Sequence, residues 1–436
     1  MRKLVIGSVL LASARIAASQ PADPQQSPPE PEAKEPGQLP EVAPTAPLPA
    51  ETAPGVPVVV AEPKKEKPSV SATYDNGLIL ESSDKQYELR IQFRNQMRFE
   101  SNRPTEAGSQ FLNKFYIPRS RLQAEGYVFG SANRYKLELG MDESGSFTFV
   151  KDMYIERRLS DAPVYVRFGQ WKRPFSRAEI VSDFAAEFNE RSIANDLAGG
   201  GRDLGISLNN DYEKSPAGIE WAVAMFNNFN GGADRPGIPV ACVTNPTTLV
   251  TTCINGRPTD IPNDFGPTIV ARAGWNSPNA KGYSEADLEG GPLRYSVGAS
   301  YKVDLANFAK HGKASIADNM SHGLELDWNL KAHGISFTGL IVMMKIKDKE
   351  TELGFNLQPG IMLVPKTIEV AARFALTTEG DRNFIEALGA FNYYAHGHRL
   401  KLASDFGVLK RTGEDPVTML TDDPDVRVRI MAQLEI

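Results

Sequence analysis

The sequence lacks the long apolar runs that transmembrane helices require. No stretch of the 436 residues approaches the ~18 consecutive apolar residues of a membrane-spanning helix, which excludes a helical membrane protein. Soluble proteins and β-barrels remain, because barrel strands form no long apolar runs. The chain also lacks a charge excess. Its 48 basic and 54 acidic residues leave a net charge of -6, which gives no indication of nucleic-acid binding.

Histidine is scarce, and no catalytic motif surrounds any histidine. The five are His311, His322, His333, His396 and His398, and none lies in a Gly-x-Ser-x-Gly, His-Glu-x-x-His or Walker-type context. His396 and His398 flank a glycine at an expected turn, where two imidazoles are more typical of turn polarity than of a metal site. We therefore expect no enzyme, no metal and no cofactor.

Cysteine is equally scarce, with Cys242 and Cys253 as its two occurrences. Both lie in a long expected loop, residues 229–265, and they are close enough in sequence to pair. The N-terminus described next implies an oxidising compartment, so we predict a loop disulfide. A metal site is the weaker interpretation, because no histidine lies beside them and two ligands would not suffice.

The N-terminal residues predict a leader and a linker. Residues 1–19 combine a basic start, a short apolar core and small residues, which is typical of a secretory signal peptide cleaved after Ala14 or Ser19. A buried N-terminal helix is the alternative. Residues 20–68 are rich in Pro, Ala and Glu and predict a disordered periplasmic linker. It serves either as a simple tether or as a segment that contacts the cell wall.

The stretch around which the chain is organised is residues 87–100, where polar and apolar side chains alternate. One parity holds Glu88, Arg90, Gln92, Arg94, Gln96, Arg98 and Glu100, and the other holds Leu89, Ile91, Phe93, Met97 and Phe99, with Asn95 as the exception. This alternation predicts a two-sided β-strand. A helix would move Ile91 and Phe99 off its apolar stripe. A soluble sheet buries the apolar face, whereas a membrane barrel turns it to lipid.

Short alternating segments recur from residue 69 to 436. In the second of them the polar parity is shared by Ile117, Arg119, Arg121, Gln123 and Glu125. The count of segments predicts an all-β transmembrane antiparallel barrel of about 16 strands. Turns near residues 131, 332, 365 and 397 are short, and those at 101–113, 170–201, 229–265 and 278–292 are long. Because such barrels combine short periplasmic turns with long external loops, we expect all four long connections to begin at the external end of the barrel.

Several motifs occur in a fixed order along the chain. Residues 115–126 hold the paired arginines Arg119 and Arg121, and residues 168–175 read Phe-Gly-Gln-Trp-Lys-Arg-Pro-Phe. Residues 188–192, 201–205, 358–360, 368–373 and 392–402 hold further short motifs. Together they resemble the phosphate-selective porin O and P family over residues 74–436. The resemblance implies a 16-stranded outer-membrane barrel, usually trimeric, that passes anions through a pore lined by basic residues.

The resemblance also assigns individual positions. The strand arginines of the family fall at Arg94 and Arg119, and its constriction tyrosine falls at Arg121. Its aspartate falls at Lys151 and its binding lysine at Glu179, while Pro118 stands where a second arginine is common. The barrel is therefore implied more strongly than phosphate specificity, which depends on the positions where this chain departs from the family.

The candidate anion-binding residues are the basic side chains expected in the lumen. They are Arg90, Arg94, Arg98, Arg119 and Arg121, predicted to form one stripe on two neighbouring strands, and Lys172, Arg173 and Arg177 of the 170–201 connection, predicted to fold inward and narrow the pore. Fixed guanidinium groups concentrate anions and bind oxyanions through two donors. Two alternatives stay open: the arginines brace the wall by pairing with lumenal glutamates, and the connection is an external lid or trimer latch.

The sequence therefore predicts a diffusion channel of the bacterial outer membrane. Its expected partners are small anions such as phosphate or polyphosphate, outer-membrane lipid and two further copies in a homotrimer. The alternatives are a non-conducting outer-membrane adhesin or anchor and a general non-selective porin. A soluble β-sandwich is a further alternative, which would extract without detergent. An outer-membrane enzyme barrel is another, which would need a Ser/His pair facing the lumen or the lipid boundary, and the sequence shows no convincing pair.

Overall fold

The structure is a computed structural model that describes residues 68–104, 110–141, 147–199, 201–227, 239–244, 251–255, 267–280, 282–305, 320–345, 350–412 and 424–436. The predicted signal peptide and all of the predicted linker except Pro68 lie outside these ranges. Within them, no helix has the length and apolar character needed to cross a membrane.

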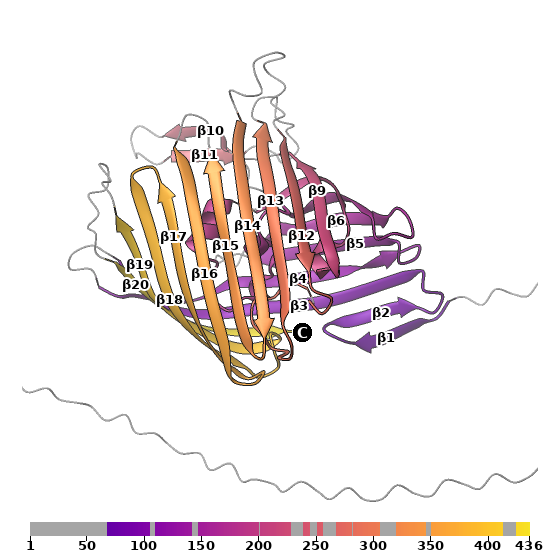
Figure 1. The fold of residues 1–436 in the computed structure, drawn as a ribbon. Coiled ribbons are helices and arrows are strands. Elements are labelled where there is room, and N and C mark those ends of the chain that lie inside the picture. The colour runs from indigo at the N-terminus through magenta and orange to yellow at the C-terminus, as the bar shows by residue number, and fades with distance from the viewer. Residues whose placement is uncertain are drawn as a thin grey trace, which may run out of the picture. The chain divides into compact units, whose positions relative to one another are not determined.

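Strands make up most of the described chain (Figure 1). The N-terminal strands are β1 (Val70–Tyr74), β2 (Leu78–Ser82), β3 (Tyr87–Arg103), β4 (Leu112–Val128), β5 (Asn133–Met141), β6 (Phe147–Arg158), β7 (Tyr165–Lys172), β8 (Arg202–Asn209), β9 (Gly218–Phe226), β10 (Pro239–Thr244) and β11 (Thr251–Asn255). The C-terminal strands are β12 (Thr268–Asn276), β13 (Arg294–Leu305), β14 (Met320–Ala332), β15 (Ile335–Lys345), β16 (Thr351–Val364), β17 (Ile368–Glu379), β18 (Arg382–Tyr394), β19 (Leu400–Thr412) and β20 (Asp425–Glu435). The helical elements are α1 (Arg177–Ile180), η1 (Asp183–Ala185), α2 (Ile193–Ala198) and η2 (Tyr212–Lys214).

Sixteen of these strands close into an antiparallel barrel, as the sequence predicted. Each strand from β3 to β9 pairs with the next, β9 pairs with β12, and the pairing continues to β20. Strand β20 then pairs with β3, with Val426 opposite Arg103 and Glu435 opposite Arg94. Closure pairs the backbone groups of all sixteen strands, which a lipid environment requires. The β1–β2 hairpin extends the sheet through the pairing of β2 with β3.

The barrel turns its apolar side chains outward. Along β3, Gln92 and Gln96 are 6% and 0% exposed, whereas Phe93 and Met97 are 38% and 57% exposed. The same alternation continues in the closing strand, where Arg429 is buried and Ile430 is exposed. A soluble sheet would show the reverse, so this burial pattern confirms the membrane-barrel interpretation of the alternation.

One predicted parity is wrong at the beginning of β4. Ile117 was assigned to the lumenal face, but it is 40% exposed on the outer surface. The register between β3 and β4 shifts between Gln96 and Arg98, opposite Arg119 and Tyr116. Pro118 lies at this shift, and proline has no N–H for the ladder, so a bulge forms there and reverses the parity before it.

The two ends of the barrel differ in their connections. The predicted turns near residues 131, 332, 365 and 397 lie at one end, which also holds the C-terminal end of β20. The connection between β7 and β8, residues 173–201, begins at the opposite end. The 278–292 connection was expected among the external loops and is not one of them. Because β12 and β13 meet at the short-turn end, residues 277–280 and 282–293 lie there.

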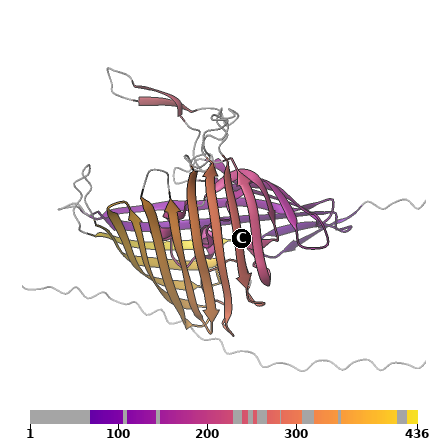
Figure 2. The same ribbon diagram turned by 45° about the horizontal axis from the view of Figure 1, so that its top comes forward.

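Both of these long connections enter the lumen. We call residues 173–199 the inward loop, and residues 277–280 and 282–293 the inward turn. Figures 1 and 2 show the coiled segments of the inward loop within the ring of strands. The two segments meet inside the barrel, where the Glu285 N–H donates to the Ala185 carbonyl oxygen at 3.2 Å. The predicted inward folding of the 170–201 connection therefore agrees with the structure.

Candidate functional site

The inward loop is folded by local capping and by small buried residues. The Ser192 hydroxyl accepts a hydrogen bond from the Asn195 N–H at 3.3 Å and caps α2, which ends at Gly199 in the left-handed conformation at φ 56°. Ala194 and Ala198 on this helix are fully buried. A short, capped helix with small side chains can pack closely against the barrel wall.

One side of the inward loop packs against the wall through an apolar cluster. The cluster consists of Trp171, Phe175, Ala194, Ala198, Ala224, Phe226, Val270, Leu340, Val342 and Met344, from β7, the inward loop, β9, β12 and β15. Two polar contacts flank it. The Lys302 ammonium donates to the Ala198 carbonyl at 2.6 Å, and Arg177 forms an ion pair with Asp327 at 2.6 Å. We call this the packed side of the lumen.

Further contacts hold the middle of the inward loop. The Lys401 ammonium donates to the Ala186 carbonyl at 2.7 Å, and the Asn189 N–H donates to the Asp405 carboxylate at 2.9 Å. Glu187 accepts from the Ser336 hydroxyl at 2.5 Å and from the Gln358 amide at 2.6 Å. These contacts come from β15, β16 and β19, so the loop is attached to strands that are far apart in the sequence.

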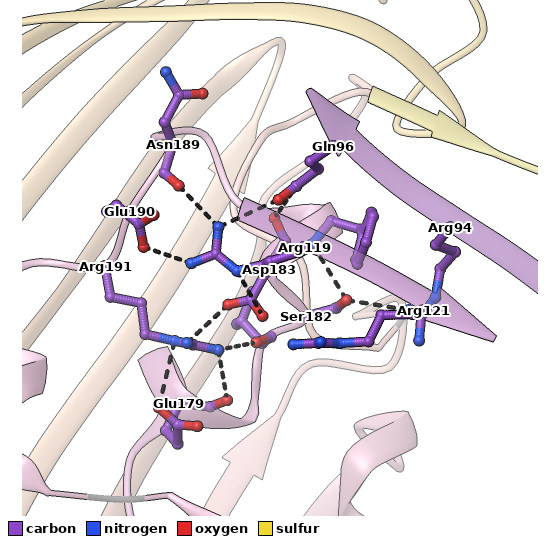
Figure 3. Close-up of polar contacts among 12 residues, drawn as sticks. Arg94, Gln96, Arg119, Arg121, Glu179, Ser182, Asp183, Asn189, Glu190 and Arg191 are labelled. Carbon is purple, nitrogen blue, oxygen red and sulfur yellow. Dashed lines mark hydrogen bonds and ion pairs between the residues drawn. The ribbon is translucent and has the colours of Figure 1, made fainter. Parts of the chain in front are cut away.

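On the other side, wall arginines bind the carboxylates of the inward loop (Figure 3). Arg119 lies between Asp183 and Glu190, with ion-pair distances of 3.3 and 2.5 Å. Arg98 binds the same Glu190 at 2.7 Å. Arg191, from the loop itself, binds Asp183 at 2.7 Å. Two of the predicted lumenal arginines therefore position the loop.

The central acid of this junction stays ionised. Burial alone would raise the pKa of Asp183, but Arg191, Arg119 and Lys172 outweigh burial and hold that pKa well below its usual range. A carboxylate that remains charged keeps its bonds to both arginines at every physiological pH. The junction is thus a permanent attachment between β4 and the inward loop.

A cavity of about 230 Å³ lies between this junction and the wall formed by β3 to β8. We call it the eyelet cavity. Its charged lining residues are Arg94, Arg121, Lys136, Lys172 and Arg202 together with Glu138, Asp152, Asp183 and Glu213. Ile180 and Phe184 of the inward loop and Tyr283 of the inward turn also line it. Both inward segments thus narrow the same space.

Wall cations and carboxylates alternate around the eyelet cavity. Glu138 binds Arg94 at 2.6 Å and Arg121 at 3.3 Å. Asp152 binds Arg202 at 2.8 Å and Lys136 at 3.3 Å. Glu138 also lies 3.8 Å from the Lys136 ammonium and 3.6 Å from the Arg202 guanidinium, so the two carboxylates share Lys136 and Arg202. The wall therefore presents cations that are fixed in position by carboxylates.

Lys172 is held in a different way from the other cations of the cavity. Its ammonium donates to the carbonyl oxygens of Glu179 at 2.6 Å and Val181 at 3.1 Å, both in the inward loop. Carbonyl oxygens orient an ammonium group without carrying a full negative charge. Lys172 thus adds a positive charge that these two partners leave uncompensated.

The structure separates the predicted pore residues into four groups. Arg94, Arg121 and Lys172 line the eyelet cavity, while Arg98 and Arg119 bind the inward loop as described. Arg173 and Arg177 bind the wall carboxylates Asp203 and Asp327, and Arg90 donates to the Asp75 carbonyl at 3.1 Å. The five strand arginines therefore make different contacts. Arg94 and Arg121 pair with the lumenal Glu138, which is the wall bracing that the sequence left open as an alternative.

Two eyelet cations were missed at the sequence level, Lys136 and Arg202. Lys136 shares the polar parity of its strand with Glu138, and Arg202 is the first residue of β8. The parity signal was present for Lys136. The pairing of both cations with Asp152 depends on β5, β6 and β8 lying close together in the barrel, which the local pattern cannot show.

The predicted disulfide falls on residues described only by their backbone. Cys242 lies opposite Cys253 in the β10–β11 hairpin, and the pairing stays a prediction. In the described part of the chain, His, Cys, Asp and Glu form no group of three or more that could hold a metal ion.

Comparison with known proteins agrees with the barrel geometry. The sequence model of the phosphate-selective porin O and P family matches residues 89–289, which include β3 to β9, the inward loop and most of the inward turn. The chain is an outer-membrane porin. The matched family and the barrel fold are typical of a channel rather than an enzyme. A comparison with curated protein sequences finds no match.

Two solved structures share the fold of this porin. The anion-selective porin from Comamonas acidovorans has a TM-score of 0.51 and 12% sequence identity, and the alignment covers 80% of this chain and 99% of that chain. The outer membrane channel DcaP of Acinetobacter baumannii has a TM-score of 0.50 and 13% identity, with 82% and 99% covered. At these identities the likeness concerns the fold.

Proposed function

We propose that the porin passes small anions through the eyelet cavity. The observation that carries this proposal is the charge of the lining, where five cationic side chains face four carboxylates. Lys172 is the lining cation that the inward loop holds through two carbonyl oxygens. A narrow space with low-dielectric walls concentrates counter-ions of the opposite sign, so a single fixed excess charge influences which ions enter.

The names of related proteins support the sign of this preference. The Comamonas porin is described as anion-selective, and the matching family is named for phosphate. In this chain, Glu179 stands where the resemblance places a binding lysine, and Arg191 lies 3.5 Å from its carboxylate. We therefore propose a general preference for small anions, with phosphate as one permeant ion among several.

The reversal potential across a KCl gradient tests the proposal. Wild-type protein in a planar bilayer should favour chloride over potassium, and Lys172→Gln should bring the permeability ratio towards one. Arg90→Gln is the matched control, because it removes a lumenal charge outside the eyelet lining. A cation preference in the wild type would contradict the proposal, as would equal ratios in wild type and Lys172→Gln.

A second measurement addresses phosphate. If phosphate is one permeant anion among several, adding it to a chloride solution should lower the current in proportion to its mole fraction. Saturating block by phosphate at low concentration would instead indicate a dedicated phosphate site. Absence of any current from correctly folded protein would support the alternative of a non-conducting adhesin or anchor.

We also propose the domain organisation and assembly expected from the sequence. Residues 1–19 form a cleaved signal peptide, residues 20–68 a periplasmic linker and residues 69–436 the barrel, which assembles as a homotrimer. Native mass spectrometry of detergent-extracted protein measures both features at once. We expect three chains per particle, each lacking its first 14 to 19 residues by cleavage after Ala14 or Ser19.

A further inference from the structure

A second cavity lies at the short-turn end of the barrel, between the inward turn and the wall. It has a volume of about 170 Å³, and its polar lining includes Ser284, Asp287, Arg294, Ser296, Lys331 and His398. It shares no lining residue with the eyelet cavity. Gly282 and Ser284 of the inward turn border this second cavity, whereas Tyr283 between them borders the eyelet cavity.

Hydrogen bonds fix the walls of the second cavity. The Asp287 carboxylate accepts from the Gly334 N–H at 2.8 Å and from the Gly290 N–H at 3.1 Å, and it also pairs with Arg294. The Lys331 ammonium donates to the Ser284 hydroxyl at 2.7 Å. The inward turn is thus attached to both β13 and β14, and the cavity is a formed site rather than a gap beside a loose segment.

Three buried nitrogen atoms of the lining have no hydrogen-bond partner among the described residues. They are both ring nitrogens of His398 and the Nε atom of Arg294. Buried polar atoms in folded proteins nearly always have a partner, because an unsatisfied one loses its bonds to water without replacement. Three such atoms around one cavity indicate that the cavity contents supply the missing partners.

The chemistry of these atoms limits what the contents can be. Arg294 Nε–H is a donor, and Lys331 retains further N–H donors beside the one that binds Ser284. Burial, together with Lys401 and Lys331, holds the pKa of His398 well below its usual range. His398 is therefore neutral and offers one donor and one acceptor nitrogen. Oxyanion oxygens suit the donors, and a hydroxyl group suits the acceptor.

We propose that this second cavity binds a small oxyanion that also carries an O–H group. The anionic oxygens accept from Arg294 Nε, Lys331 and the donor nitrogen of His398, and the O–H donates to the other ring nitrogen. Hydrogen phosphate and a hydroxycarboxylate such as lactate both have this chemistry, whereas sulfate and acetate lack the O–H. This site does not depend on the ion preference of the eyelet cavity.

Histidine NMR on the full-length protein in detergent tests the site. The chain has five histidines, so ¹⁵N-histidine labelling gives few signals, and His398→Gln identifies the signal of His398. We expect phosphate and lactate each to shift that signal saturably, with sulfate and acetate shifting it little. No shift with phosphate or lactate would overturn the proposal, and an equal response to sulfate would overturn the assigned ligand class. A response to phosphate alone, or to lactate alone, would restrict the class to that source.

A pair of lysine variants provides the structural control. Lys331→Gln removes a donor from the cavity and should weaken phosphate binding by roughly tenfold, the scale of one charge-assisted hydrogen bond. Lys366→Gln removes the same charge from an exposed turn at the same end of the barrel and should leave binding unchanged. Retention of the folded, heat-modifiable band on gels confirms that both variants assemble. Equal binding by both variants would overturn the proposal.

Lys172→Gln separates this inference from the proposed function. Its residue lies in the eyelet lining, outside the second cavity, so phosphate should still shift His398 in this variant. Loss of anion preference with an unchanged His398 response would support both proposals. An unchanged preference with a normal His398 response would contradict only the eyelet mechanism.

Discussion

The two sides of the inward loop differ in chemical character: one contacts apolar side chains and the other contacts charged ones. Towards β9, β12 and β15 the loop is sealed by an apolar cluster that includes Phe175, Phe226 and Leu340, all at most 1% exposed. Towards β3, β4 and β5 it faces arginines, lysines and carboxylates around a cavity. The same loop is thus a packed core on one side and the wall of a pore on the other.

This difference separates stability from selectivity. Apolar burial holds the loop in place and is insensitive to salt, whereas charges at a water-filled cavity are screened over a Debye length of about 10 Å at 0.1 M salt. Changes on the packed side should therefore alter the size of the pore. Changes on the eyelet side should alter which ions enter.

The largest effect is expected from Phe175→Ala on the packed side. Phe175 is fully buried in the apolar cluster, and truncation of such a phenylalanine costs about 3–5 kcal/mol. The barrel ladders remain, so the protein should assemble but the inward loop should detach. Single-channel conductance should then rise several-fold, with weaker ion preference.

Phe184→Ala, in the same loop, is the matched comparison for Phe175→Ala. Phe184 borders the eyelet cavity and lies under the Arg94 guanidinium at 4.8 Å. Its loss should widen the cavity locally and raise the conductance less. A larger conductance in Phe184→Ala than in Phe175→Ala would show that the packed side does not hold the loop.

The next effect in size concerns Glu138→Gln in the eyelet cavity. Glu138 binds Arg94 and Arg121 and lies within 3.8 Å of Arg202 and Lys136, so its neutralisation leaves four cations with less compensation. Anion preference should increase, clearly at about 0.1 M KCl and weakly at about 1 M, where the Debye length is about 3 Å. Glu100→Gln provides a control on the same lumenal face, outside the cavity lining. Reversal potentials that fail to depend on salt would exclude an electrostatic mechanism.

The smallest effect concerns pH and the middle of the inward loop. Burial, followed by the neighbouring Glu369 and Glu285 carboxylates, raises the pKa of Glu187 well above its unfolded value of 4.5. The Glu187 carboxyl therefore binds its proton more tightly when the inward loop is docked than when the loop is detached. The contribution of protonated Glu187 to the stability of the docked loop is complete below the unfolded pKa. It is lost as the pH rises through the raised pKa of Glu187.

Amide hydrogen exchange in residues 185–189 measures this loss. After correction for intrinsic rates, protection in the wild type should fall as the pH rises from the unfolded pKa through the raised pKa of Glu187. Glu187→Gln keeps a neutral side chain with the same shape, so its protection should vary much less over that interval. Equal pH dependence in both proteins would show that Glu187 does not titrate with docking.

Much of the fold follows from local alternation. Side chains of a strand point to opposite faces, so the polar parity of residues 87–100 predicted the lumenal face of β3, and the repeated pattern predicted sixteen strands. The same rule failed at Ile117, because the bulge at Pro118 depends on how β4 pairs with β3. It also failed to show that the inward turn enters the lumen from the short-turn end.

By itself, the sequence determined the barrel, the outward apolar face and the position of the basic residues on lumenal strands, because these depend on neighbours in the chain. Only the tertiary structure decided what each basic residue does. Arg119 meets Glu190 across 71 residues, and Arg177 meets Asp327 across 150. Such pairs form because closure of the barrel and folding of the inward loop bring distant charges into a shared, poorly solvated space. The local sequence around an arginine contains no information about that partner.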